Sequence, residues 1–233
     1  KFTTIPKQLS FSKTAAYLHI TTNETIAGTQ WHHLPYDCGV PLVADMSSDI
    51  LSRTLDFNKF DLIYAGAQKN MGAAGVNLVV INKNILGKAE RIIPTVLDYQ
   101  NHIHEKSMLN TPPVFAVYVA MLTLRWLKEQ GGVAAIETIN QQKADLLYST
   151  LESIPFIHLP VAKEDRSQMN VVFTMKDEAL EKEFLQYAKD ANMYGVKGHR
   201  SVGGFRMSLY NALPLSSVQY GVDIIKAFAA RKG

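Results

Sequence analysis

Residues 62–70 read LIYAGAQKN, an apolar run that passes into a glycine and then into polar residues. Short apolar runs bounded by turn signals are typical of strands buried in a sheet that is covered on both faces. Residues 15–21, 41–44 and 75–81 have the same character, and residues 41–44 lead directly into Asp45. Amphipathic segments of helical length follow these runs, so the sequence predicts an α/β fold. In such folds the polar residues that directly follow strands lie at the sheet edge where ligands bind.

Composition narrows the class of protein. The chain has 233 residues, of which 47% are hydrophobic and 19% charged, so it can bury a sizeable core. Its 24 basic and 21 acidic side chains give a net charge of +3, which does not suggest a nucleic-acid partner. The longest apolar run, residues 112–122, is shorter than the roughly 20 residues that cross a bilayer, so no membrane partner is expected. The single cysteine, Cys38, excludes an internal disulfide and is consistent with a cytoplasmic location.

The second half of the chain predicts a helical bridge and a smaller unit. A helix over residues 133–152 is followed by a strand over 169–174, a helix over 178–191, a strand over 205–209 and a helix over 214–230. We therefore expect residues 1–135 to form the C-terminal part of a large cofactor-binding domain. Residues 136–233 are expected to form a small C-terminal domain.

A long helix is predicted between Pro112 and the glycine pair at 131–132, which is the usual order of helix-starting and helix-ending residues. Asn110 or Thr111 is the expected N-cap. Tyr118 and Trp126 are expected to face the core from this helix.

Lys69 is the first candidate for chemistry. A lysine at the end of a strand is most often a surface residue whose ammonium group reaches water. However, Gly66 and Gly72 flank this one, and glycines let the backbone approach a ligand closely. Partial burial lowers the pKa of a lysine, which is what a Schiff-base lysine requires. Asp45, 24 positions earlier, is either a turn former or a carboxylate at the same sheet edge.

Residues 198–206 read GHRSVGGFR and form the second candidate. The glycines permit a tight backbone, and guanidinium groups suit carboxylate and phosphate ligands. A solvated basic loop is the alternative, but Arg206 falls within a predicted strand, where an unpaired charge would be costly. No metal site is expected, because His102 and His104 lack a suitably spaced acidic or cysteine partner.

Taken together, these segments resemble the phosphoserine aminotransferase family of class V, pyridoxal-phosphate enzymes. The matching segments are residues 23–28, 44–53, 63–70, 110–113, 197–204 and 210–214. The resemblance implies the pyridoxal-phosphate-dependent transferase fold of type I, which is aspartate-aminotransferase-like. That fold has a three-layer large domain and a smaller α+β C-terminal domain. The implied reaction is reversible amino transfer between phosphoserine and 2-oxoglutarate, giving 3-phosphohydroxypyruvate and glutamate, in serine biosynthesis. Some members also act in pyridoxine biosynthesis.

The resemblance also implies how the cofactor, pyridoxal 5′-phosphate, would be held. Lys69 would attach it covalently and later move a proton at the substrate α-carbon. Asp45 would face its pyridine nitrogen, and a carboxylate there keeps the nitrogen protonated so that the ring withdraws electrons. Thr25 would bind its phenolic oxygen, and Gln68 its phosphate.

Further residues would bind the substrate or a second subunit. Arg206 would bind the substrate α-carboxylate, while His199 and Arg200 would bind the distal phosphate or carboxylate. Asn110 and Thr111 would reach the cofactor phosphate of the neighbouring subunit in a homodimer with its active site at the interface.

Members of this family are longer than this chain, so we expect it to lack roughly the N-terminal third and to be impaired when alone. Two alternatives stay open from the sequence. One is another type I pyridoxal enzyme, such as a different aminotransferase or a desulfurase. The other is a non-catalytic unit whose basic loop binds anions.

Overall fold

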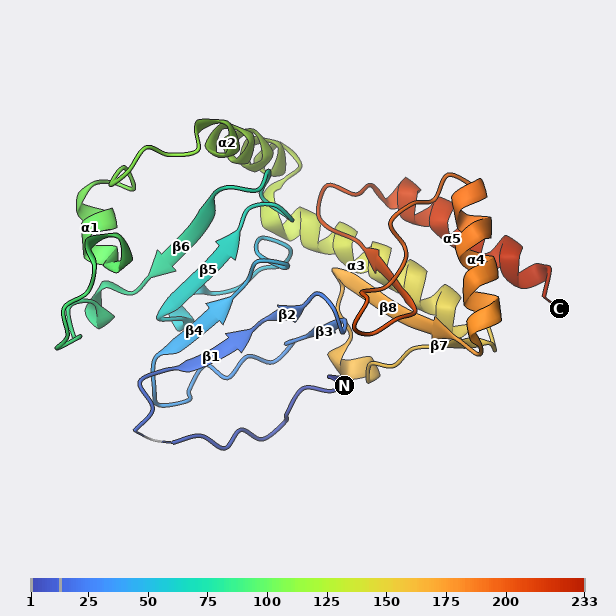
Figure 1. The fold of residues 1–233 in the computed structure, drawn as a ribbon, viewed down its shortest axis with the longest axis horizontal. Coiled ribbons are helices and arrows are strands. Elements are labelled where there is room, and N and C mark those ends of the chain that lie inside the picture. The colour runs from blue at the N-terminus through green and yellow to red at the C-terminus, as the bar shows by residue number, and fades with distance from the viewer. Residues whose placement is uncertain (1, 13, 233) are drawn as a thin grey trace.

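The structure is a computed structural model that describes residues 2–12 and 14–232 (Figure 1). The described residues form three sheets, of which the two larger ones each have their own apolar core. A long helix, α3 (Gly132–Glu152), extends between these two sheets. Apolar runs and amphipathic segments alternate along the chain as predicted, and the α/β expectation is confirmed.

The first sheet has the order β1-β4-β5-β6. Its strands are β1 (Leu18–Thr21), β4 (Leu42–Asp45), β5 (Leu62–Gly66) and β6 (Asn77–Ile81). The first three are parallel and β6 is antiparallel to β5. The register places Thr21, Asp45 and Tyr64 side by side in one row. Parallel pairing therefore brings the carboxyl ends of β4 and β5 to the same edge, as the sequence predicted.

The two faces of this sheet differ in their surroundings. Ala44, Ile63 and Ala65 are buried on one face and pack with residues such as Met46 and Ile50 from the segment that follows β4. Because side chains alternate along a strand, the opposite face carries Asp45 and Tyr64. This second face is partly exposed, and it presents Asp45 and Tyr64 near the edge where the parallel strands end.

A small hairpin follows β1 and was not predicted from the sequence. It consists of β2 (Asn23–Glu24) and β3 (Thr29–Gln30), each only two residues long. Its turn requires Gly28, which has φ +82° and lies so close to β8 that a Cβ would be 2.9 Å from the Asn170 carbonyl oxygen. The hairpin turn contains Thr25, and Gly28 presses it against the second sheet.

Helices α1 (Tyr99–His104) and α2 (Val114–Glu129) lie on the β6 side of the first sheet in Figure 1. The long predicted helix is confirmed as α2, but two details were wrong. Neither Asn110 nor Thr111 caps it: Pro113 is the N-cap, and the Asn110 side chain donates instead to the Thr111 carbonyl at 3.1 Å. Tyr118 does not face the core, because 53% of it is exposed.

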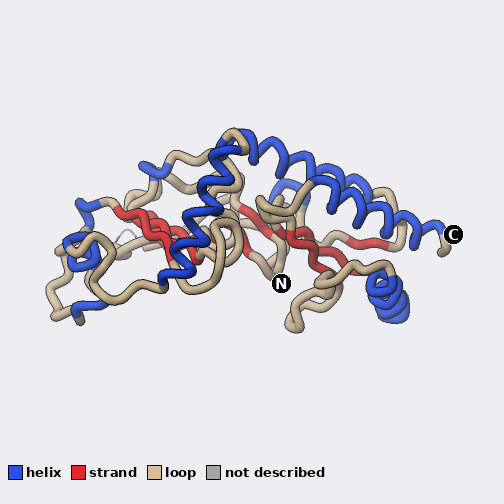
Figure 2. The backbone as a smooth tube through the Cα atoms, turned by 90° about the horizontal axis from the view of Figure 1, so that it is seen from above, coloured by secondary structure: helices blue, strands red, loops and turns tan. Residues whose placement is uncertain are grey.

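The second sheet is antiparallel, with β8 (Asn170–Met175) between β7 (Ile157–His158) and β9 (Phe205–Ser208). Figure 2 shows α3 and α5 (Leu215–Ala230) along one side of these strands and α4 (Glu178–Asp190) on the other. Phe173, Phe184, Phe205 and Phe228 form the centre of its core. The described residues also include four short 3-10 helices: η1 (Phe57–Lys59), η2 (Lys83–Ile85), η3 (Thr95–Leu97) and η4 (Lys163–Asp165).

Residues that precede the first strand lie against the second unit. The Thr3 carbonyl accepts a hydrogen bond from the Ala162 amide at 2.9 Å, and the Ile5 amide donates to the buried Asp165 carboxylate at 2.8 Å. The expected boundary between residues 135 and 136 falls inside α3, and the division into two domains stays a prediction. Within the described ranges, none of the helices is both long and apolar enough to cross a membrane.

Candidate active site at the edge of the first sheet

Lys69 lies in a tight turn that closes directly after β5. The Ala67 carbonyl accepts hydrogen bonds from the amides of Met71 at 3.0 Å and Gly72 at 2.7 Å. Lys69 Nζ donates to Thr25 Oγ1 at 2.7 Å, across 44 residues of chain. The amine is half-buried, so it points into the protein and is not a surface lysine of the ordinary kind.

Several charges surround this amine. Burial is the largest influence and lowers the pKa of Lys69. The carboxylates of Asp45, Glu24 and Asp49 raise it, whereas the Arg206 guanidinium lowers it further. The net effect is a lowered pKa, so a larger share of Lys69 is neutral and nucleophilic than in an exposed lysine.

Asp45 occupies the last position of β4, on the polar face of the sheet. Its Oδ1 accepts a hydrogen bond from the Ser47 amide at 2.8 Å, which fixes the side chain beside the sheet edge. Burial, together with the nearby Asp45 carboxylate, raises the pKa of the Tyr64 phenol. Tyr64 is also hydrogen-bonded to His19 Nε2 at 3.0 Å. Asp45 therefore belongs to a row of polar groups, Asp45–Tyr64–His19, that the sequence analysis did not recognise as a set.

Arg206 approaches the same place from the second sheet. It lies on β9, and its NH1 donates to the Thr25 carbonyl oxygen at 3.4 Å. Thr25 thus accepts a hydrogen bond from Lys69 on its hydroxyl oxygen and one from Arg206 on its carbonyl oxygen. Three predicted site residues, from three separate segments of the chain, converge on one hairpin turn.

The glycine-rich loop after α4 is closed at its base and exposed at its tip. The Gly198 amide donates to the Gly204 carbonyl at 2.8 Å, and a Cβ on Gly198 would be 2.0 Å from the Gly203 carbonyl oxygen. His199 Nδ1 is hydrogen-bonded to the Ser201 hydroxyl at 2.7 Å. Arg200 is exposed, so it and His199 are available to a ligand at the tip of the loop.

The remaining predicted residues lie apart from this convergence. Gln68 is exposed beside Lys69. Asn110 and Thr111 are exposed before α2, and in the described part of the chain no hydrogen bond joins either of them to Lys69 or Arg206. The same ranges hold no cluster of three or more His, Cys, Asp or Glu side chains that could bind a metal ion.

Buried polar residues beneath the site were missed by the sequence analysis. Asn23 donates to Ser48 Oγ and to Asn170 Oδ1, both at 2.8 Å, and so joins the hairpin to both neighbouring units. Asp49 is fully buried and accepts from Thr22, and also from Gln30 at 3.2 Å and Arg53 at 3.3 Å. The sequence signal that could have identified Asn23 and Asp49 is their position within a few residues of the ends of apolar strands.

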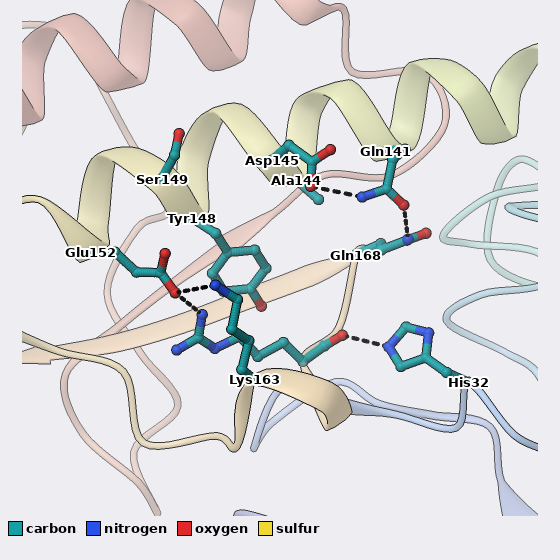
Figure 3. Close-up of a pocket in the computed structure, with 10 residues that line it drawn as sticks. His32, Gln141, Ala144, Asp145, Tyr148, Ser149, Glu152, Lys163 and Gln168 are labelled. Atoms are coloured by element: carbon teal, nitrogen blue, oxygen red, sulfur yellow. Dashed lines mark hydrogen bonds and ion pairs between the residues drawn. The ribbon is translucent and has the colours of Figure 1, made fainter.

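A separate cavity of about 320 Å³ lies between α3 and residues 163–168 (Figure 3). Its charged groups are already paired: Glu152 binds both Arg166 at 2.5 Å and Lys163 at 3.6 Å. Gln141 links Gln168 to Asp145 in the same way. Because these side chains satisfy one another and none of the predicted site residues lines the cavity, the candidate site is the edge around Lys69.

Known proteins resemble this chain in sequence and in fold. The sequence profile described as aminotransferase class-V matches residues 2–220. The chain belongs to the class V aminotransferases. Among curated relatives, the phosphoserine aminotransferase of Flavobacterium johnsoniae is 52% identical over 230 residues, which cover 99% of this chain and 64% of that protein. The phosphoserine aminotransferase of Bacillus cereus is 50% identical and covers 98% and 64% of the two chains.

Solved structures place this class V aminotransferase in the same fold. The phosphoserine aminotransferase of Bacillus circulans superposes with a TM-score of 0.93 at 41% identity, covering 97% of this chain and 63% of that one. A PLP-bound phosphoserine aminotransferase from Trichomonas vaginalis superposes with a TM-score of 0.88 at 37% identity, covering 93% of this chain and 62% of that one. The predicted family and fold type are therefore confirmed. The chain spans about 64% of the length of the curated relatives it matches.

Proposed function

We propose that Lys69 binds pyridoxal 5′-phosphate and that its site serves reversible amino transfer between phosphoserine and 2-oxoglutarate, with turnover expected to be impaired in this chain alone. The products are 3-phosphohydroxypyruvate and glutamate. One observation carries the proposal: the half-buried Lys69 amine, 2.7 Å from the Thr25 hydroxyl, lies where burial lowers its pKa. Identities of 50–52% to phosphoserine aminotransferases support the choice of substrates.

The residues present fit the ring end of this cofactor. Binding requires a partly neutral amine for the aldehyde, a carboxylate for the pyridine nitrogen and a donor for the phenolic oxygen. Lys69, Asp45 and Thr25 supply these three groups around one sheet edge. Gln68, exposed beside Lys69, is the proposed partner of the phosphate.

The cofactor, when bound, supplies a conjugated ring that accepts electrons from the substrate α-carbon. The chain's own groups then perform the remaining tasks. Lys69 Nζ takes the α-proton and returns it, which its lowered pKa favours because the neutral amine is a base. Asp45, held by the Ser47 amide, remains an acceptor facing the sheet edge. Arg206, directed toward Thr25, binds the substrate α-carboxylate through its guanidinium group.

Specificity for a distal phosphate is proposed for His199 and Arg200. Both lie at the tip of a loop whose base is closed by hydrogen bonds, so they can meet a ligand without rearranging the sheet. Arginine suits phosphate because its planar fork can form two parallel hydrogen bonds.

Covalent capture at Lys69 tests cofactor binding. Pyridoxal phosphate is added to the 233-residue chain, the adduct is reduced with borohydride, and peptides are analysed by mass spectrometry. We expect the mass increase on the peptide that contains Lys69, and its loss in Lys69→Ala. Lys197→Ala is the control, because that lysine is exposed and directly precedes the glycine-rich loop at residues 198–206. Equal labelling of the parent and Lys69→Ala would disprove the assignment.

Substrate choice separates this proposal from another type I pyridoxal enzyme. We expect glutamate to form from 2-oxoglutarate with phosphoserine and far less with serine. Arg200→Ala should reduce the preference for phosphoserine by roughly ten- to a hundredfold, the range expected for one lost charged hydrogen bond. Equal use of serine by the parent would favour the alternative enzyme. Absence of both amino transfer and covalent capture at Lys69 would favour the anion-binding unit.

We further propose that the protein is a homodimer in which Asn110 and Thr111 reach the partner's cofactor phosphate. Apolar side chains directly after them are unusually exposed: Val114 is 69% and Phe115 74% exposed. Large exposed apolar patches mark surfaces that another protein covers. Sedimentation of the parent and of Phe115→Glu tests this, and we expect a dimer for the parent and a monomer for the variant. A monomeric parent would contradict the proposal. The expected cytoplasmic location stays a prediction.

A further inference from the structure

A chain of buried amide side chains runs from the residue after Lys69 into the second unit. Asn70, Asn211 and Asn140 are 5%, 4% and 0% exposed. The main-chain amide of Asn211 donates to Asn70 Oδ1 at 3.0 Å, and Asn140 Nδ2 donates to Asn211 Oδ1 at 2.9 Å. We call these three residues the amide relay. They come from the turn after β5, the segment after β9 and helix α3.

The side chains of the relay also donate hydrogen bonds to three consecutive main-chain carbonyls of the first unit. Those of residues 50, 51 and 52 accept hydrogen bonds from Asn70 at 3.1 Å, Asn211 at 2.9 Å and Asn140 at 3.0 Å, respectively. Leu51 has φ +57°, a left-handed conformation that is unfavourable for a leucine. Such a conformation persists only when its surroundings fix it, and the three relay bonds do so.

The segments that the relay joins are those that carry the site. Residues 50–52 follow Asp45, Asn70 follows Lys69, and Asn211 lies five positions after Arg206. On the ligand side the same segments meet at Thr25, which contacts both Lys69 and Arg206. Contacts between the two units therefore lie both at the site and beneath it.

We propose that the amide relay is a positioning device that holds the Lys69 amine in register with Asp45 and Arg206. The inference rests on the proposed function, since these are the groups of that reaction. Hydrogen bonds between buried amides are directional and leave unsatisfied groups when they break, whereas apolar contacts would let the two units slide. Asn70 and Asn211 are thus positioning residues, not catalytic ones.

The surroundings of the Lys69 amine can be probed without cofactor, through the pKa of that amine. The 233-residue chain is trace-labelled with acetic anhydride over a series of pH values, and the Lys69 peptide is quantified by mass spectrometry. The midpoint reports the pKa of Lys69, which depends on its burial and on the charges of Asp45, Glu24, Asp49 and Arg206. Asn70→Leu removes both relay bonds of residue 70 without changing any charge.

We expect the midpoint in Asn70→Leu to rise toward the ordinary value of lysine, because the freed turn lets water reach the amine. Phe184→Leu, in the core of the second unit, is the control for lost stability and should leave the midpoint unchanged. If Asn70→Leu does not fold, Asn70→Ser replaces it, since a serine is too short to reach both partners. An unchanged midpoint in the folded variant, or an equal rise in Phe184→Leu, would overturn the proposal.

The two proposals can fail separately. Covalent capture of pyridoxal phosphate at Lys69 in the parent tests the proposed function and does not depend on Asn70. The labelling midpoint tests the relay and requires neither cofactor nor substrate.

Discussion

Lys143 is a lysine with no exposed surface, held in the interior by three main-chain carbonyls. Its Nζ donates to the carbonyls of Leu209 at 2.8 Å, Tyr210 at 3.0 Å and Leu213 at 3.1 Å. Burial lowers the pKa of Lys143 from 10.5 to about 8. The charged form is therefore favoured less in the folded protein than in the unfolded chain, and folding must depend on pH through this residue.

The sign and size of that dependence follow from the two pKa values. Between about pH 8 and pH 10.5 the unfolded chain binds more protons at this position, so the free energy of unfolding rises with pH. The full difference corresponds to about 3 kcal/mol, and about 2 kcal/mol of it appears between about pH 7.5 and pH 9.5. Below about pH 7 the residue is charged in both states and contributes no further slope.

Urea unfolding of the parent and of Lys143→Met at these two pH values measures the effect. Other titrating groups cancel in the difference between the two proteins, and the carbonyls that methionine leaves without a donor add an offset that does not vary with pH. We expect the stability of the parent relative to Lys143→Met to increase by about 2 kcal/mol over this range. Lys226→Met, on the exposed side of α5, should show no such trend. A difference independent of pH would refute the reasoning.

Three further changes test other contacts. Thr25→Val removes the acceptor that favours the charged form of Lys69, so the pH midpoint of Lys69 acetylation should fall; a rise would contradict the assigned contact. Gly28→Ala forces a Cβ into a left-handed turn against β8 and should destabilise the protein by more than about 1 kcal/mol in urea, and a neutral effect would exclude the close approach. Asp49→Asn leaves the buried Arg53 without its counter-charge and should destabilise by roughly 3 kcal/mol; thermal unfolding that is unchanged would show that this pair is not buried.

The fold was predictable where local signals are strong. The strands of the first sheet, helix α4 and helix α5 follow from apolar runs and helical periodicity. Asp177 is the N-cap of α4, and its side chain accepts a hydrogen bond from the Leu180 amide at 2.8 Å. The hairpin β2–β3 was missed because two-residue strands have no periodicity to detect. Tyr118 was misplaced because α2 is apolar on nearly all sides, so its sequence could not indicate which side is buried.

The candidate site divides in the same way. Lys69 and Asp45 were predicted as site residues because each follows an apolar run of the sequence, and their neighbours along the chain suffice for that prediction. The partner of Asn70 could not be identified, because Asn211 is 141 residues away and its position depends on how the second sheet packs. The roles of all the predicted site residues stay predictions.

The sequence by itself determined the order of the strands of the first sheet and of the longer helices, and the kinds of side chain at the sheet edge, because those depend on residues a few positions apart. Only the tertiary structure decided that the Lys69 amine is half-buried against Thr25, that Arg206 reaches the same turn and that three asparagines join the units beneath it. Burial and hydrogen bonding between distant segments are properties of the packed chain, since no short stretch of sequence specifies which groups will be removed from water together.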